Sequence, residues 1–319
     1  MTPPATEGYA GFEGHQTWYR IVGELPGQGT GDGEGGGGPA PLVALHGGPG
    51  ATHDYLLSLA DLATGGRAVI FYDQTGNGKS THFPDRGADY YTVDLFRREL
   101  DNLIGHLGIG RRYHVLGQSW GGMLAQEHAI TRPPGLRSVT LSNTAASFGG
   151  FAAESGSLRS GLPPEVEQTL RRHEEAGTTG DPEYAAACRV YYQRHLCRAD
   201  PWPAEVDASF AAIDADPTVY HTTNGPSEFH IVGSFRDWSA AGRLAEITAP
   251  TLVISGRHDE ATPKLQAELV AGIPGAEQVI ARTPRTCRSG RSGTPTWPRS
   301  AASCAATTMT GEDASRGPS

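Results

Sequence analysis

The chain has 319 residues, a formal net charge of −9 and 37% hydrophobic residues. This length suits one large α/β domain with an insertion, or two ordinary domains. The acidic balance argues against a nucleic-acid partner, which needs a basic face, and no apolar run reaches the length of a membrane span. The sequence begins without a basic and then apolar signal, so we expect a cytoplasmic protein.

Two strand-like patches open the sequence, at residues 17–22 and 41–45. Between them runs GQGTGDGEGGGG, residues 27–38, in which glycine is too frequent for the segment to offset the entropy of ordering. Because this segment separates two expected strands, we interpret it as a long hairpin loop that joins them.

From residue 42 onward, apolar strand patterns alternate with helical patterns. The expected strands are residues 42–45, 67–72, 113–116, 136–141 and 250–254, and the expected helices are residues 92–107 and 120–130. Buried strands that alternate with helices predict a mostly parallel sheet covered on both faces.

Composition divides the chain into parts. Residues 1–145 and 239–280 carry the strand and helix alternation and are expected to form one α/β core in two pieces. Residues 146–238 are rich in Glu, Arg and Ala and are expected to form a helical cap over the carboxyl edge of the sheet, where α/β folds bind ligands. Residues 281–319 hold only Trp297 and Met309 as large apolar side chains, so we expect disorder there.

A nucleophile motif follows the expected strand 113–116. Gly117-Gln118-Ser119-Trp120-Gly121 matches G-x-S-x-G between a strand and a helix. The sharp turn strains the serine backbone and crowds strand against helix, which requires the flanking glycines. We therefore expect Ser119 to be a nucleophile that projects above the sheet.

A second glycine-rich motif, HGGPG at residues 46–50, follows the expected strand 42–45. Main chain without side chains can approach a substrate closely and direct N–H groups at a carbonyl oxygen. Gly48 and the N–H of Trp120 are the expected oxyanion hole. Asp259 follows the strand 250–254 and is the expected triad acid, because Ser precedes Asp in this fold. The adjacent His258 is interpreted as structural.

With these motifs in hand, the chain resembles the proline iminopeptidase and amino-acid amidase branch of the α/β-hydrolases. The matching segments are HGGPG at 46–50, YDQTGNGKS at 72–80, GQSWGG at 117–122, NGPSEF at 224–229 and SGRHDEATP at 255–263. The resemblance implies an α/β-hydrolase fold with a mostly parallel sheet, helices on both faces and an inserted helical cap.

The resemblance also implies an activity, namely release of an N-terminal proline or another small apolar residue through an acyl-enzyme on Ser119. By the same resemblance, Glu228 and Glu260 hold the free ammonium of a peptide or amino-acid amide, and Asp73 braces the loop near the site. A cation in a partly desolvated pocket needs such paired anionic oxygens. Triad chemistry implies no metal and no cofactor.

One element of the triad is missing from this sequence. The order Ser, Asp, His places the base after Asp259, yet the last of the twelve histidines is His258. Possible codons for residues 285–288, read in a shifted frame, encode His-Met-Pro. We therefore hypothesise a frameshift near residue 281. This chain would then be nearly inactive, whereas its ancestor, with the original C-terminus, was an active peptidase.

Other functions remain open at this point. An amino-acid amidase or an esterase could use the same site. A binding protein or an impaired pseudo-enzyme is a different class, favoured by the missing histidine. The sequence indicates neither the preferred N-terminal residue nor the oligomeric state.

Overall fold

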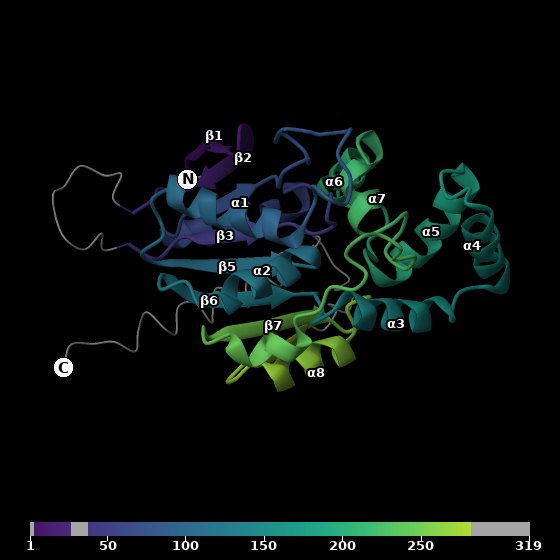
Figure 1. Ribbon diagram of the computed structural model, residues 1–319. Coiled ribbons are helices and arrows are strands. Elements are labelled where there is room, and N and C mark those ends of the chain that lie inside the picture. Colours follow the sequence, from purple (N-terminus) through teal and green to yellow (C-terminus); the bar gives the residue numbers. More distant parts are fainter. Residues whose placement is uncertain (1–2, 27–37, 282–319) are drawn as a thin grey trace, which may run out of the picture.

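An eight-stranded sheet forms the centre of the molecule. The computed structural model describes residues 3–26 and 38–281 (Figure 1). The strands lie in the order β1-β2-β4-β3-β5-β6-β7-β8, with β3 to β8 parallel and β1 and β2 antiparallel at one edge. Their bounds are β1 Ala5–Phe12, β2 His15–Val22, β3 Leu42–Leu45, β4 Val69–Tyr72, β5 Tyr113–Gln118, β6 Leu136–Ser142, β7 Thr251–Gly256 and β8 Glu277–Ala281.

Helices pack on the sheet because alternate strand residues point to opposite faces. Their bounds are η1 Asp54–Gly65, α1 Val93–His106, α2 Trp120–Ile130, α3 Phe148–Arg159, α4 Pro164–Ala176, α5 Pro182–His195, α6 Ala204–Ala215, α7 Thr218–Thr223, η2 Ala241–Glu246 and α8 Pro263–Gly272. Val43 and Ile70 join the core cluster that contains α1, α2 and α8 side chains, whereas their neighbours Leu42 and Val69 pack with η1. Layers on both sides of a parallel sheet confirm the expected fold class.

The interpretation of the N-terminal region as one hairpin is wrong. The strand β2 pairs with β4, where Val22 lies opposite Val69, and β4 in turn pairs with β3. The strand β4 therefore lies between β2 and β3, and the hairpin partner of β2 is β1. Residues 27–37, the glycine-rich stretch, lie outside the described residues.

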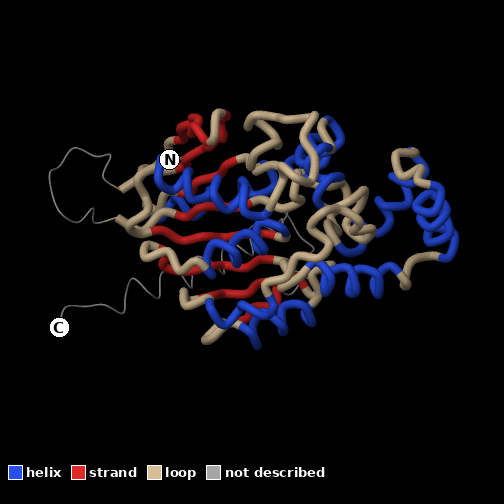
Figure 2. Tube along the Cα trace, viewed as in Figure 1, coloured by secondary structure: helices blue, strands red, loops and turns tan. Residues whose placement is uncertain are grey.

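Five helices, α3 to α7, come between β6 and β7 in the chain. They lie beyond one end of the sheet, with α4 and α5 farthest out (Figures 1 and 2). A separate apolar cluster inside this group includes Leu170, Tyr184 and Tyr191. The expected helical cap thus has a structural counterpart here, while its exact limits stay a prediction.

The expectations for the C-terminal stretch concern residues 281–319, of which only Ala281, the last residue of β8, lies in the described part of the chain. This applies to both the expected disorder and the hypothesised frameshift. Within the described ranges, no helix is both long and apolar enough to cross a membrane.

Candidate active site

Ser119 lies on a sharp turn between β5 and α2. Its backbone has φ 53° and ψ −122°, a conformation that side-chain-bearing residues rarely adopt. A Cβ on Gly117 would overlap the carbonyl oxygen of Gly121, and a Cβ on Gly121 would overlap that of Leu45. Both glycines are therefore required where the strand and the helix cross, as the motif predicts.

The HGGPG loop follows β3 and runs beside this turn. Gly48 has φ 107°, and a Cβ there would overlap the backbone nitrogen of Gly50. The Gly47 N–H donates to the Tyr55 hydroxyl at 2.6 Å, and Tyr55 donates to Gln118 Oε1 at 2.5 Å. Tyr55 therefore joins the glycine loop to the residue that precedes Ser119, a contact that the sequence did not indicate.

A second set of hydrogen bonds, made by Gln74 after β4, holds the same loop. His46 Nε2 accepts from the Gln74 N–H at 3.0 Å, and the Gln74 amide donates back to the His46 carbonyl at 2.9 Å. Gln74 Oε1 also accepts from the Trp120 ring at 2.8 Å. Burial lowers the pKa of His46, which keeps Nε2 available as an acceptor. His46 is thus a structural part of the loop.

Asp73, expected to brace the loop near the site, makes three hydrogen bonds there. One oxygen accepts from the backbone and the ring of His53, at 2.9 and 2.8 Å, and the other accepts from the Lys79 N–H at 2.9 Å. Burial opposes ionisation, but the hydrogen bond and charge of His53 lower the pKa of Asp73. A charged Asp73 therefore ties the segment after β4 to the glycine loop.

A small cavity brings the predicted residues together at the carboxyl edge of the sheet. Gly48, Ser119, Trp120 and Glu228 all line it. The remaining lining residues are Met123, Asn143, Thr144, Phe148, Phe151 and Asn224. Its volume is about 10 Å³, enough for a single water molecule. A substrate side chain therefore enters only after some of these side chains move.

The two predicted ammonium ligands are both buried, Glu228 with 8% and Glu260 with 7% of its surface exposed. Glu228 accepts from the Tyr220 hydroxyl at 2.8 Å, and Glu260 Oε2 has no partner within the described residues. Burial raises the pKa of Glu228 to about 7. Burial, and then the charges of Glu228 and Asp259, raise the pKa of Glu260 well above its ordinary range. Among the described residues, neither carboxyl group has a basic side chain as an ion-pair partner.

Asp259 lies in the turn after β7. It accepts from the Ala261 N–H at 2.9 Å. Asn143 follows β6, has φ 46° and lines the Ser119 cavity. Burial raises the pKa of Asp259 to about 7. The side-chain Nδ2 of Asn143 has no hydrogen-bond partner among the described residues, and its place in the Ser119 cavity is one that sequence reasoning missed.

No histidine is positioned as the base in the described part of the chain. All twelve histidines fall within it, and none has a hydrogen bond to Ser119 or to the side chain of Asp259. Several have other partners, such as Asp73 for His53 and Tyr113 for His128. His258 is exposed. The mismatch noted in the sequence therefore persists in three dimensions.

One group of side chains in the described residues has metal-ligand chemistry, namely His173, Asp181 and Glu183. Arg172 forms an ion pair with Glu183 at 2.6 Å, and Asp181 accepts from the Glu183 N–H at the start of α5. The ion pair joins α4 to α5, and none of the three residues with metal-ligand chemistry lines the Ser119 cavity.

Comparison with known proteins agrees with this geometry. The family model for the alpha/beta hydrolase fold matches residues 40–283. A proline iminopeptidase of Saccharolobus solfataricus is 37% identical over 239 residues, covering 75% of this chain and 76% of the relative. One from Lactobacillus helveticus is 36% identical over 260 residues, covering 81% and 83%. The chain belongs to the proline iminopeptidase family of α/β-hydrolases.

Solved structures extend the family match. The crystal structure of VinJ is 43% identical, covers 97% of this chain and 99% of its own, and superposes with a TM-score of 0.88. A proline iminopeptidase from Mycobacterium smegmatis is 41% identical with the same coverage and a TM-score of 0.82. The resemblance read from the motifs is therefore confirmed over nearly the whole length of these relatives.

Proposed function

We propose that this hydrolase is a serine aminopeptidase, which releases proline or another small apolar residue from the N-terminus of a peptide or an amino-acid amide. The curated relatives that match it are named proline iminopeptidases. The single observation that carries the proposal is the shared cavity, in which Ser119 and the buried Glu228 face the same space beside Gly48 and Trp120.

Bond cleavage begins at Ser119. Its Oγ attacks the carbonyl carbon of the N-terminal residue, and the negative charge on the carbonyl oxygen is stabilised by the N–H groups of Gly48 and Trp120. The C–N bond breaks as the leaving nitrogen takes up the proton that the serine hydroxyl loses, the amine leaves, and water then releases the acyl group from Ser119. A base that takes the hydroxyl proton speeds both halves, and Asp259 is the acid that would orient it.

Selectivity for a free N-terminus is assigned to Glu228 and Glu260. A substrate ammonium bound between them stabilises their ionised forms, which otherwise repel each other in a buried site. An N-acylated peptide brings no charge, so the carboxylates would stay unpaired at a desolvation cost. This is the physical reason for an exopeptidase.

Preference for a small apolar residue is assigned to the cavity wall. Met123, Phe148 and Phe151 line the space beside Ser119, and the space itself holds one water. A proline ring needs only a modest rearrangement of these side chains, whereas a large side chain needs more. Initial rates on prolyl, alanyl and leucyl amides would rank these residues, and a matching ester series would reveal an esterase.

The binding half of the proposal can be tested without turnover. The Ser119→Ala variant is titrated calorimetrically with prolinamide and with N-acetylprolinamide. We expect prolinamide to bind and the acetylated compound not to bind. In the Glu228→Gln variant, prolinamide should bind at least about tenfold more weakly, since a charge-assisted contact is lost. Equal affinity for both compounds would contradict the assignment of the ammonium site.

The pH dependence sharpens this test. The carboxyl pKa of Glu228 is about 7, and a free α-amino group has a pKa of about 7.7–8.0. Ionised carboxylate and protonated amine coexist best between these values. Prolinamide affinity should therefore rise as the pH rises to about 7 and fall above about 8, and a flat profile would argue against carboxylate recognition.

A further inference from the structure

A second, larger cavity lies beside Asp259, with a volume of about 380 Å³. That volume falls in the range of about 300–1,000 Å³ typical of ligand pockets. Its wall comes from three parts of the chain, namely α3, the end of α5 with the residues that follow, and the turn after β7. The lining residues are Leu158, Gln193, Arg194, His195, Arg198, Arg257, His258, Asp259 and Thr262.

The charge of this wall is strongly positive. Arg194, Arg198 and Arg257 line it, and Asp259 is the single carboxyl among the lining residues. Arg194 donates to the Gly161 carbonyl at 3.0 Å. The side chains of Arg198 and Arg257 have no hydrogen-bond or ion-pair partner within the described part of the chain.

Two polar features complete the wall. His195 lines the cavity, and its Nδ1 atom is shielded from solvent without a hydrogen-bond partner among the described residues. On the neighbouring side, the acidic Glu154 is already held by Thr262 at 2.9 Å and by Lys264 at 2.5 Å. Among the described residues, the guanidinium groups of Arg198 and Arg257 are therefore unpaired cations in this wall, which suits an anionic ligand.

The position of the cavity relative to the nucleophile follows from the sheet. Ser119 follows β5 and Arg257 follows β7, and β6 lies between these parallel strands. Two strand spacings correspond to about 10 Å, and an extended peptide advances about 3.3 Å per residue. Arg257 is therefore about two to three residues away from a carbonyl attacked by Ser119. Asn143, which lines the Ser119 cavity, follows the intervening strand β6.

We propose that this arginine-lined cavity binds the C-terminal carboxylate of a short peptide, two or three residues after the scissile bond. The proposal rests on the proposed function, because it places the N-terminal residue at Ser119. It narrows the substrate class to tripeptides and tetrapeptides with free C-termini. A dipeptide carboxylate falls short of the arginines, and a longer peptide extends past them.

The test is a binding experiment with the full-length Ser119→Ala protein, so it does not depend on turnover. Pro-Ala-Ala-Ala is titrated calorimetrically at low salt, once as the free acid and once as the C-terminal amide. We expect the free acid to bind about tenfold more tightly, and the difference to shrink in high salt. In the dipeptide pair Pro-Ala and Pro-Ala-amide, the difference should be about twofold or less, because the dipeptide carboxylate does not reach the arginines.

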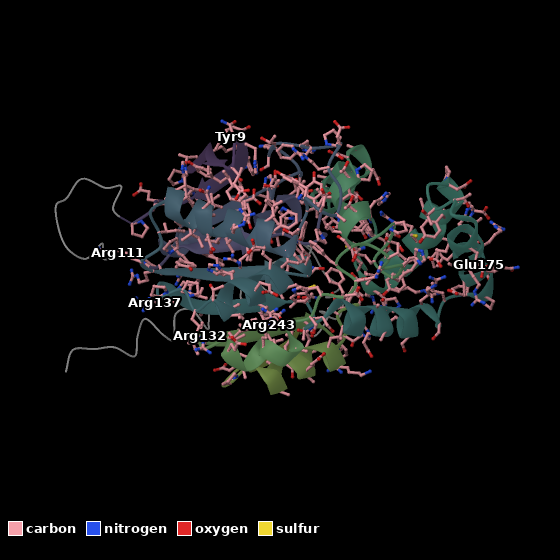
Figure 3. The ribbon with its side chains drawn as sticks, in the orientation of Figure 1. Tyr9, Arg111, Arg132, Arg137, Glu175 and Arg243 are labelled. Carbon is pink, nitrogen blue, oxygen red and sulfur yellow. The ribbon has the colours of Figure 1, made fainter. Side chains whose placement is uncertain are left out.

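Substitution of the two unpaired arginines tests whether they cause the preference for the free acid. Arg198→Ala combined with Arg257→Ala should remove the preference for the free acid. Both side chains are exposed and unpaired among the described residues, so folding should be unaffected, as a thermal melt would verify. Arg137→Ala is the matched control. Arg137 is exposed and lies at the end of the molecule opposite to Glu175 on α4 (Figure 3).

The outcomes separate the two proposals. Equal affinity of acid and amide, or a preference that survives in the double variant, overturns the carboxylate site while the proposed function stands. Prolinamide, which reports on the ammonium site alone, is titrated in parallel. If prolinamide does not bind, the proposed function fails, and the acid and amide pair still decides on the cavity.

Discussion

Two regions at the carboxyl edge of the sheet differ in how completely hydrogen bonds hold their site residues, namely the region around Ser119 and the region around Asp259. On the side of β3 and β5, Ser119 and the glycine loop are held by Tyr55, Gln74 and Gln118 through hydrogen bonds of 2.5 to 3.0 Å. On the side of β7, Asp259 borders a cavity of about 380 Å³ with unpaired arginines, and no histidine bridges it to Ser119 among the described residues.

Because of this difference, two parts of serine catalysis can be considered separately, namely stabilisation of the oxyanion and transfer of the serine proton. The proposed stabilisation of the oxyanion needs only the glycine loop and the start of α2, and Gly48 and Trp120 both line the Ser119 cavity. Transfer of the serine proton needs a base held by the acid, and among the described residues no histidine has a hydrogen bond to Ser119 or to the side chain of Asp259. The protein should therefore bind and polarise a substrate carbonyl far better than it turns the substrate over.

The largest expected effect concerns the missing base. In subtilisin, loss of the histidine costs on the order of 10⁶ in kcat, about as much as loss of the whole triad. We expect the unmodified chain to hydrolyse a prolyl chromogenic amide within about tenfold of the Ser119→Ala rate. Added imidazole should raise the rate by about 10²-fold, the lower end of general-base catalysis, and only where Ser119 is present.

An N-methylated analogue sharpens that prediction. 1-Methylimidazole can accept the serine proton but has no N–H to donate to Asp259, so it should give little rescue. Asp259→Asn should weaken rescue by imidazole for the same reason. If both bases accelerate hydrolysis equally and without saturation, the base acts from bulk solvent, and Asp259 is not the orienting acid. A normal turnover number without any added base would contradict the account of the missing histidine.

The next largest expected effect concerns the stability of the turn that carries Ser119. In Gly121→Ala, the new methyl group would overlap the carbonyl oxygen of Leu45, which is backbone and cannot rotate away. We expect a loss of at least about 3 kcal/mol in the free energy of unfolding, measured by urea denaturation. The control is Gly149→Ala in α3, where a Cβ meets nothing within 4 Å. This control should be neutral or gain up to about 1 kcal/mol from helix propensity.

Sequence reasoning predicted this turn and the glycine loop because their constraints are local. Steric exclusion of a Cβ beside Ser119 leaves a pattern of glycines that can be read without the fold. Tyr55, Asn143 and Tyr220 left no such pattern, because their contacts depend on how distant segments approach each other. The same reason explains the wrong hairpin, since the insertion of β4 between β2 and β3 is a property of strand order.

A smaller effect on the reactivity of Ser119 is expected when the Tyr55 hydroxyl is removed. Tyr55→Phe removes the acceptor for the Gly47 N–H and the donor to Gln118. The rate at which a fluorophosphonate labels Ser119 should fall about tenfold, less than for loss of an oxyanion donor itself. Prolinamide affinity should stay within about twofold, because the ammonium ligands are untouched. Tyr90→Phe is the control, since its hydroxyl has no hydrogen-bond partner among the described residues. A parallel loss of labelling and affinity would indicate general disruption.

The smallest effect is on stability against pH. Burial raises the carboxyl pKa of Glu99, Glu228 and Asp259 to about 7, from ordinary values of 3.8 to 4.5, and it raises that of Glu260 well above its ordinary value. The folded state then holds protons that the unfolded state releases, so the free energy of unfolding should fall as the pH rises from about 4.5 to 7. Glu260→Gln should flatten this fall and add about 1 kcal/mol at pH 8. Stability that rises over this range would contradict the raised pKa values.

The most direct test of the central claim is acylation of Ser119. An activated prolyl ester needs little help from a base to react, and the acyl-enzyme should persist because water also lacks a base. After incubation with proline p-nitrophenyl ester, peptide mapping by mass spectrometry should find the prolyl group on Ser119. The adduct should be absent in Ser119→Ala and greatly reduced for the N-acetylated ester. A prolyl group on another residue, or equal labelling by both esters, would contradict the account.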